Sequence, residues 1–429
     1  MISVQNRQPR SSGSKLLWLS LLIAVGAACS PKTRVMKPVY ERGEKGSTEK
    51  TEAKKADEKP EKSNKPAASR WTSDKPGISL ILPFGTDRIN REQPAAADLS
   101  KADLAIQFYQ GFRLGLDSVA SVTGQDIRLR IFDSGDDYNK LLSLSRNAGL
   151  RTSDLIVGPI FPSGIKNFAS FSGSVRRPVL SPLSASPPSE FSNPYLISFT
   201  VPLEVHAREA AVFTLKKLKP AQIFIIRSPL SEELKYTKPF RQMIDSLSNG
   251  KVPVTEMLIK NGDITALQAK MSTRGNSVFV IPSTSKFFID ATLKGIDKIA
   301  HRYPVAVIGH PLWEKVSGLN MALLTRLNTR ITTASRINYR SPEVVSFVRA
   351  YRSRFQTEPN EYAFKGFETA NYFGRLISEE GGDFAETLSK NPAKGLSNNL
   401  EWALTPAAGW VNEHVFILRY DNLELKNEQ

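Results

Sequence analysis

Side chains that could carry out chemistry are few in this chain, and they are far apart. The sequence has one cysteine, Cys29, and four histidines at positions 206, 301, 310 and 414. No two of these histidines have the HxH or HxxxH spacing that lets a pair of imidazoles bind one metal ion. A single cysteine can form neither an internal disulfide nor a zinc cluster. The sequence therefore predicts no metal site and no cofactor.

Short catalytic motifs are also absent, with one weak exception. The chain contains no GxSxG nucleophile elbow, no HExxH helix, no P-loop and no GxGxxG loop. Ser283 and Lys286 match the pattern S-x-x-K, in which the lysine could activate the serine. So short a pattern also arises by chance, and a lysine there is equally suited to an exposed helix start. We expect a protein that is not an enzyme.

Two loops rich in serine are the best candidates for a binding site. The segments 158–164 and 181–188 each follow a short apolar run. Ser163, Ser184 and Ser186 could hold an anion together with the free N–H groups at a helix start. Serine is equally suited to capping helices and closing turns when no ligand is present. The residues alone leave both interpretations open.

The elements that would position these loops alternate regularly from residue 76 onward. Apolar runs at 78–84, 127–132, 155–157 and 178–180 predict strands, and the intervening segments, above all 105–116, have helical spacing of apolar residues. Strands that alternate with helices favour a parallel sheet with helices on both faces.

The same rhythm starts again after residue 202. Strands are predicted at 222–226, 254–259, 277–281 and 305–309, followed by helices at 342–356 and 361–380 and two late strands near 400–404 and 414–420. Two series predict two lobes. We assign 76–200 with 335–395 to the first and 203–332 with 396–429 to the second. The chain is expected to cross between the lobes near 200–203, 331–339 and 392–400.

The N-terminal segment predicts export. Residues 16–28 form an apolar run of 13 residues after a basic stretch, too short for the roughly 20 residues that span a bilayer. This is typical of a signal peptide covering residues 1–28. Cys29 follows Gly26-Ala27-Ala28, which resembles a bacterial lipoprotein lipobox and implies lipidation of Cys29. The alternative is an ordinary signal peptide with a cysteine there by chance.

Residues 29–75 predict a disordered tether, because Lys, Glu, Ala and Pro dominate and large apolar side chains are scarce. Ser30 follows the cysteine and no acid occurs before Glu41, which by resemblance to lipoprotein sorting signals implies the outer membrane, with the folded part in the periplasm. The formal charge of +16 favours anionic partners. No nucleic-acid-binding motif is present, so we expect no nucleic acid partner.

Taken in order, the motifs resemble the type I periplasmic-binding proteins, the family of the leucine/isoleucine/valine-binding proteins. The resemblance rests on Phe108–Val119, Asp154–Ile160, Pro178–Ser186, Asn193–Pro202 and Ser341–Phe373, and it covers residues 76–429. It is closest to a branch found in lipoproteins and in cell-wall proteins with LysM modules. The resemblance implies a two-lobed α/β fold, with each lobe a parallel sheet flanked by helices and a ligand cleft between the lobes.

The resemblance also implies which residues would line that cleft. The ligand-binding candidates are Phe161, Ser163, Ser181, Ser184 and Ser186 in the first lobe, and Ser228, Ser283, His310 and Trp313 in the second. In amino-acid-binding members, an acidic or aromatic residue of the second lobe holds the ammonium. No aspartate stands at that place here, so the sequence favours a small polar or anionic ligand.

Three functions remain open on the sequence alone. The first is an envelope lipoprotein that binds a small ligand, a wall fragment or an envelope partner protein. The second is the substrate-binding lipoprotein of an ABC importer for amino acids or related solutes. The third is a ligand-free scaffold for protein interaction. If bulky side chains such as Phe161 or Trp313 fill the cleft, the scaffold is favoured.

Overall fold

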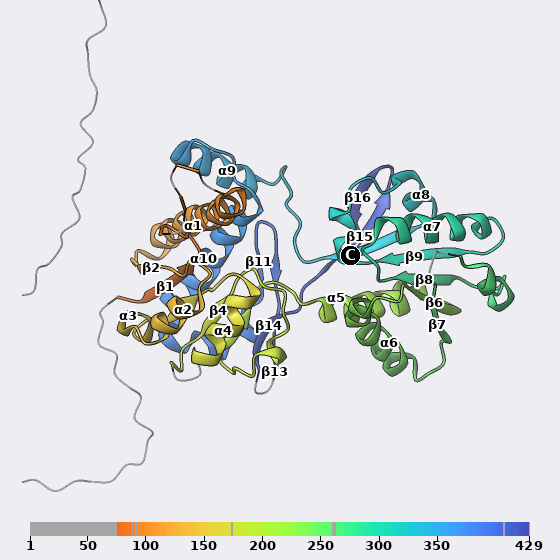
Figure 1. The fold of residues 1–429 in the computed structure, drawn as a ribbon, viewed down its shortest axis with the longest axis horizontal. Coiled ribbons are helices and arrows are strands. Elements are labelled where there is room, and N and C mark those ends of the chain that lie inside the picture. Colours follow the sequence, from red (N-terminus) through yellow and green to blue (C-terminus); the bar gives the residue numbers. More distant parts are fainter. Residues whose placement is uncertain are drawn as a thin grey trace, which may run out of the picture. The chain divides into compact units, whose positions relative to one another are not determined.

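The computed structural model describes residues 75–428 except 88, 91, 94, 173–174, 260–262 and 406–407. The predicted signal peptide, Cys29 and the tether up to residue 74 lie outside the described residues. Within the described part of the chain, two seven-stranded sheets form, one in each of two lobes (Figure 1). No helix in this part is both long enough and apolar enough to span a bilayer.

The first lobe is built on a sheet whose strands come from two separate parts of the chain, residues 77–198 and residues 402–412. In spatial order they are β13 (Trp402–Thr405), β14 (Gly409–Asn412), β5 (Leu196–Ser198), β4 (Val179–Ser181), β3 (Leu155–Val157), β1 (Gly77–Leu82) and β2 (Arg128–Asp133). Its helices are α1 (Ala96–Thr123), α2 (Tyr138–Ser145), α3 (Ala148–Arg151), α4 (Pro162–Ser172), α9 (Pro342–Phe355) and α10 (Glu361–Glu380).

The second lobe has a sheet with the corresponding order. Its strands are β16 (Glu424–Asn427), β15 (Phe416–Asp421), β10 (Thr329–Thr333), β9 (Val305–Gly309), β8 (Ser277–Ile281), β6 (Gln222–Arg227) and β7 (Val254–Leu258). Its helices are α5 (Leu203–Phe213), α6 (Leu234–Ser248), α7 (Lys286–Ala300) and α8 (Met321–Arg326). Figure 1 shows α5 and α6 on one face of this sheet and α7 and α8 on the other.

Shorter elements connect these. A separate hairpin pairs β11 (Ala393–Lys394) with β12 (Asn399–Leu400). Short 3-10 helices of three to ten residues occupy Pro188–Glu190, Ser231–Glu233, Thr265–Lys270, Pro311–Lys315 and Gly381–Lys390, and a π-helical turn at Thr214–Leu218 extends α5.

Apolar residues on both faces of each sheet explain why helices cover both sides. The strands β1, β3, β6 and β8 read as nearly unbroken apolar runs, and most of their side chains are fully buried. Such runs are the pattern of parallel strands that are buried on both faces. The expectation of a two-lobed α/β fold with two helix-flanked, mainly parallel sheets is confirmed.

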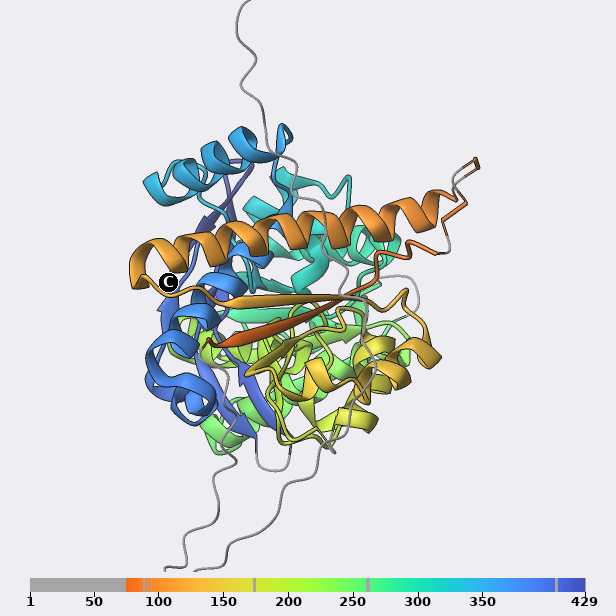
Figure 2. The same cartoon turned by 90° about the vertical axis from the view of Figure 1, so that its left-hand side faces the viewer.

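Two motifs behind the family resemblance turn out to position the framework. Gly111 on α1 and Gly366 on α10 let these helices pack backbone to backbone, because a Cβ on Gly111 would lie 1.9 Å from the carbonyl oxygen of Ala363. Figure 2 looks onto the first lobe, with α1 running across the view. Gly158 adopts φ +94°, and a Cβ there would lie 2.3 Å from the carbonyl oxygen of Ile81. Close packing therefore requires glycine at positions 111, 158 and 366.

The predicted assignment of the C-terminal segment is wrong in part. Residues 396–429 were expected together in the second lobe, but β13 and β14 pair into the first sheet and only β15 and β16 join the second. The segment 392–400 does not cross between lobes either, because it folds back on itself as the β11–β12 hairpin. The last crossing lies at 412–416. Strand β14 continues the first sheet by pairing in parallel with β5, a long-range choice that local sequence does not reveal.

Candidate ligand site between the two lobes

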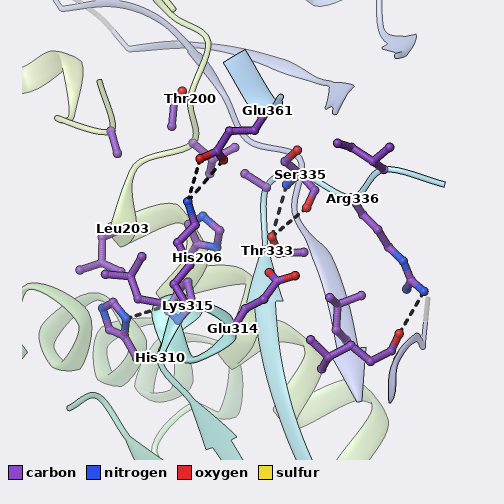
Figure 3. A pocket seen from close by; sticks show the side chains of 18 of the residues that line it. Thr200, Leu203, His206, His310, Glu314, Lys315, Thr333, Ser335, Arg336 and Glu361 are labelled. Carbon is purple, nitrogen blue, oxygen red and sulfur yellow. Dashed lines mark hydrogen bonds and ion pairs between the residues drawn. The ribbon is translucent and has the colours of Figure 1, made fainter. Parts of the chain in front are cut away.

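A pocket of about 720 Å³ is lined by residues of both lobes and of the segments that connect them (Figure 3). Ala185 comes from the loop after β4, and Glu361 and Lys365 come from the first two turns of α10. The other wall carries His206 from α5 and residues 310–312 and 314–315 from the turn after β9. The connecting segments contribute Thr200, Val201 and 333–337. Since both loops follow parallel strands, the pocket lies at the carboxyl edges of both sheets.

The serine candidates of the first lobe do not line this pocket. Ser163 is exposed near the start of α4, and Ser181 is buried with a hydroxyl that has no hydrogen-bond partner among the described residues. Ser184 is buried, and its hydroxyl accepts a hydrogen bond from the backbone N–H of Ser186 at 3.3 Å. Ala185, between them, is the residue that reaches the pocket. Phe161 packs on the core of the first lobe and lies within 5.6 Å of the Lys101 ammonium.

The second-lobe candidates mostly hold their own loops together. Ser228 is buried, and both its N–H and its hydroxyl donate to the carboxylate of Glu233 at 2.7 Å. Ser283 is fully buried, and its carbonyl oxygen accepts the indole N–H of Trp313 at 2.8 Å. Lys286, the lysine of the S-x-x-K pattern, pairs with Asp290.

Of the nine predicted residues, His310 is the one that lines the pocket. Its Nδ1 accepts the backbone N–H of Leu312 at 3.1 Å, which fixes the start of the turn. Trp313 is 1% exposed and lies against Gly309, inside the core of the second lobe. Neither Phe161 nor Trp313 therefore fills the pocket.

Two charged side chains of the pocket lack a hydrogen-bonding or ion-pair partner among the described residues. They are Lys365 and Glu314. Lys365 is half-buried, and desolvation lowers the pKa of its ammonium, while the nearby carboxylate of Glu361 works in the opposite direction. Glu314 is exposed, yet desolvation by the surrounding protein raises the pKa of its carboxyl.

The other charged side chains of the pocket form an ion pair or a hydrogen bond. Lys315 of the second lobe forms an ion pair with Glu361 of the first at 3.3 Å, which Figure 3 shows as dashed lines. Arg336 donates through Nη2 to the carbonyl oxygen of Leu425 at 3.0 Å. Among the described residues, Lys365 of the first lobe, Arg336 of the connecting segment and Glu314 of the second lobe thus have no ion-pair partner.

Two buried histidines complete the second-lobe wall. His206 shares a hydrogen bond of 2.9 Å between its Nδ1 and the hydroxyl of Thr332. Burial lowers the pKa of His206 to about 3, and the neighbouring His310 lowers it further in the same direction. Burial alone lowers the pKa of His310 to about 4. Both rings are therefore neutral at physiological pH and offer hydrogen bonds, not charge.

Sequence reasoning missed the two residues that matter most here. Glu314 immediately follows the predicted candidate Trp313, and it places on the second-lobe wall an acid of the kind that an ammonium group requires. Lys365 stands four residues after Glu361 on a predicted helix, so both fall on one face. Nothing local marks that face as the one that turns toward a loop fifty residues earlier in the chain.

No protein-family model and no curated protein sequence matches the chain. Solved structures do resemble it. A Rhodospirillum rubrum protein assigned to a branched-chain amino acid ABC transporter has a TM-score of 0.62 at 14% identity, over 82% of this chain and 99% of that one. A Desulfitobacterium hafniense ABC transporter substrate-binding protein in complex with Leu has a TM-score of 0.52 at 14% identity, over 82% and 100%.

LpoA from Haemophilus influenzae has a TM-score of 0.54 at 12% identity, over 82% of this chain and 59% of that one. This chain thus spans little more than half the length of LpoA. These neighbours are type I periplasmic-binding proteins. The chain has their fold. At identities of this order the likeness establishes the architecture and leaves the ligand open.

Proposed function

We propose that this protein is an extracytoplasmic binding module that holds a small zwitterionic ligand in the pocket between its lobes. The observation that carries the proposal is the pair of unpartnered charges, Lys365 on the first lobe and Glu314 on the second. A partly desolvated charge without an ion-pair partner is costly, so a ligand that supplies the opposite charge is bound favourably. An anionic group would lie at Lys365 and a cationic group at Glu314.

The polar groups around these charges suit a free amino acid or a short peptide of the cell wall. His206, Thr333 and Ser335 offer hydrogen bonds, and the volume of about 720 Å³ leaves room for a side chain. An open pocket, with Trp313 withdrawn into the core, supports ligand binding over a ligand-free scaffold. Delivery to an ABC importer is the second candidate, because several structural neighbours are ABC substrate-binding proteins.

The test is ligand binding by the mature chain in detergent, measured by calorimetry with L- and D-amino acids and their dipeptides. We expect at least one zwitterion to bind, and Lys365→Met and Glu314→Gln each to weaken it about 10–100-fold, the effect of losing one charge-assisted hydrogen bond. Lys238→Met and Glu379→Gln, both exposed and outside the pocket, are matched controls. Binding that survives both pocket substitutions would contradict the proposal.

We also propose that a lipid on Cys29 anchors the protein at the outer membrane, with the two lobes in the periplasm. The sole cysteine directly after Gly26-Ala27-Ala28 supports this. Cys29→Ala is expected to shift the protein from the detergent-requiring membrane fraction to a soluble or unprocessed form, while Ser30→Ala is not. Unchanged membrane fractionation of Cys29→Ala would sink the idea of a lipid anchor.

A further inference from the structure

A second pocket, of about 580 Å³, lies in the first lobe and shares only Arg336 with the lining of the ligand pocket described above. Its walls are α10, the β11–β12 hairpin and the segment that leads into α9. Apart from Arg336, which lies on the segment that links the lobes and donates to Leu425 of the second lobe, this lining belongs to the first lobe. A molecule bound here would be a second ligand.

The acid at the floor of this pocket is already satisfied. Glu368 of α10 is 5% exposed, and its carboxylate accepts hydrogen bonds from the backbone N–H groups and side chains of Ser397 and Asn398. Burial raises the pKa of the Glu368 carboxyl, against the effect of these bonds. The Glu368 carboxylate thus holds the hairpin on α10, and its hydrogen bonds to Ser397 and Asn398 leave it poorly suited to binding a cationic ligand.

The cations that line the pocket have no acidic partner. Arg375 on α10 and Lys394 on the hairpin are both exposed, and they form no hydrogen bond or ion pair with any residue in the described part of the chain. Arg336 uses Nη2 on Leu425, but its Nη1 is buried and donates to no described residue. Opposing them, besides Glu368, is the exposed carboxylate of Glu343 at the first turn of α9.

Backbone geometry adds to this positive field. Ser341, which caps the 14-residue helix α9 by accepting the N–H of Val344, also lines the pocket. The positive end of the helix dipole and its free N–H groups therefore lie at the pocket wall, next to two uncompensated cations on other elements. Guanidinium and ammonium groups that line one pocket suit the oxygens of a phosphate or carboxylate.

We propose that this pocket is a separate binding site for a small oxyanion, either a phosphate-bearing or a carboxylate-bearing molecule, held by Arg375, Lys394 and Nη1 of Arg336. The site is independent of the zwitterion pocket and does not rest on the function proposed for it. The bound anion contacts Arg336 on the segment that links the lobes.

The experiment titrates the mature chain in detergent with inorganic phosphate and, in a second arm, with citrate, using calorimetry in a buffer free of both. We expect saturable binding of one of them, which identifies the oxyanion class. Arg375→Gln combined with Lys394→Gln should weaken it at least tenfold. Lys390→Gln, a nearby exposed lysine outside the pocket, should not change it. Thermal unfolding checks that each variant is folded.

Lys365→Met separates this site from the ligand pocket, because Lys365 is the unpaired cation there. Binding that persists in Lys365→Met and is lost in the double variant supports the proposal. Binding that is lost in Lys365→Met and persists in the double variant places the anion between the lobes and overturns it. Absence of saturable binding of both anions to the unaltered chain overturns it as well.

Discussion

The two lobes correspond strand for strand, yet their pocket walls differ in chemistry. Strands β4 and β9 occupy the same place in their sheets, and the turn after each reaches the ligand pocket. After β4 the turn is small and rich in serine, with Ala185 at the pocket. After β9 it carries a histidine, a buried tryptophan and an acid. The two sheets have the same strand order, but the turns that follow corresponding strands differ in sequence. The first-lobe wall has a small side chain, Ala185, and the cation Lys365, whereas the second-lobe wall has the anion Glu314.

The largest expected effect is on stability, when the buried indole of Trp313 is removed. Trp313→Ala removes a fully buried side chain and its hydrogen bond to Ser283, and we expect it to cost about 3–5 kcal/mol of unfolding free energy. Leu183→Ala, in the corresponding turn of the first lobe, removes a half-buried side chain and should cost about 1 kcal/mol. Urea unfolding measures both. Equal losses would mean that the two turns are built alike after all.

A smaller and pH-dependent difference follows from the histidines, which lie on the second-lobe wall. Because the folded pKa values of about 3 for His206 and about 4 for His310 lie below the usual value of 6.5, the unfolded chain binds more protons between these limits. The stability that the neutral rings contribute is complete above pH 6.5. It is lost as the pH falls, by up to about 1.4 kcal/mol per pH unit for each histidine.

Thermal unfolding between pH 7.5 and 4.5 measures this loss. His206→Gln and His310→Gln should each flatten the decline in melting temperature below pH 6.5. Glu314 and Glu368, whose pKa values are raised, act in the opposite direction, so the difference between each variant and the unaltered chain is the relevant quantity. An identical pH dependence in all three proteins would show that these rings are not held neutral by burial.

The lobes were predictable from sequence because most strands are short apolar runs bounded by turn residues, and apolar residues recur at helical spacing in the segments between them. The glycines in the family-like motifs were visible too, although their reason, the contact of α1 with α10, was not. The ligand pocket was predicted at the right edge of the sheets, and of the nine predicted side chains His310 lines it. Ser228 and Ser283 look available in sequence, whereas the fold uses them to bind Glu233 and to anchor Trp313.

The parts that escaped prediction depend on contacts between distant segments. Lys365 reaches the pocket because α10 packs along α1, and no residue near position 365 records that pairing. The last crossing was misplaced for the same reason. Strand β14 has no local feature that distinguishes pairing with β5 from pairing with β10, and only the completed first sheet provides its parallel partner.

The order of the last four long strands has a consequence for how the protein is made. The chain runs through β13 and β14 at the edge of the first sheet, crosses at 412–416, and completes the second sheet with β15 and β16. Until those final residues are synthesised, β5 and β10 each expose a row of unpaired backbone groups, the kind of edge that invites aggregation. The first sheet cannot be completed until β13 and β14 have been translated, after most of the second lobe, and the second sheet must wait for β15 and β16. The nascent polypeptide therefore keeps an unpaired sheet edge, and depends on protection, until β15 and β16 have been synthesised.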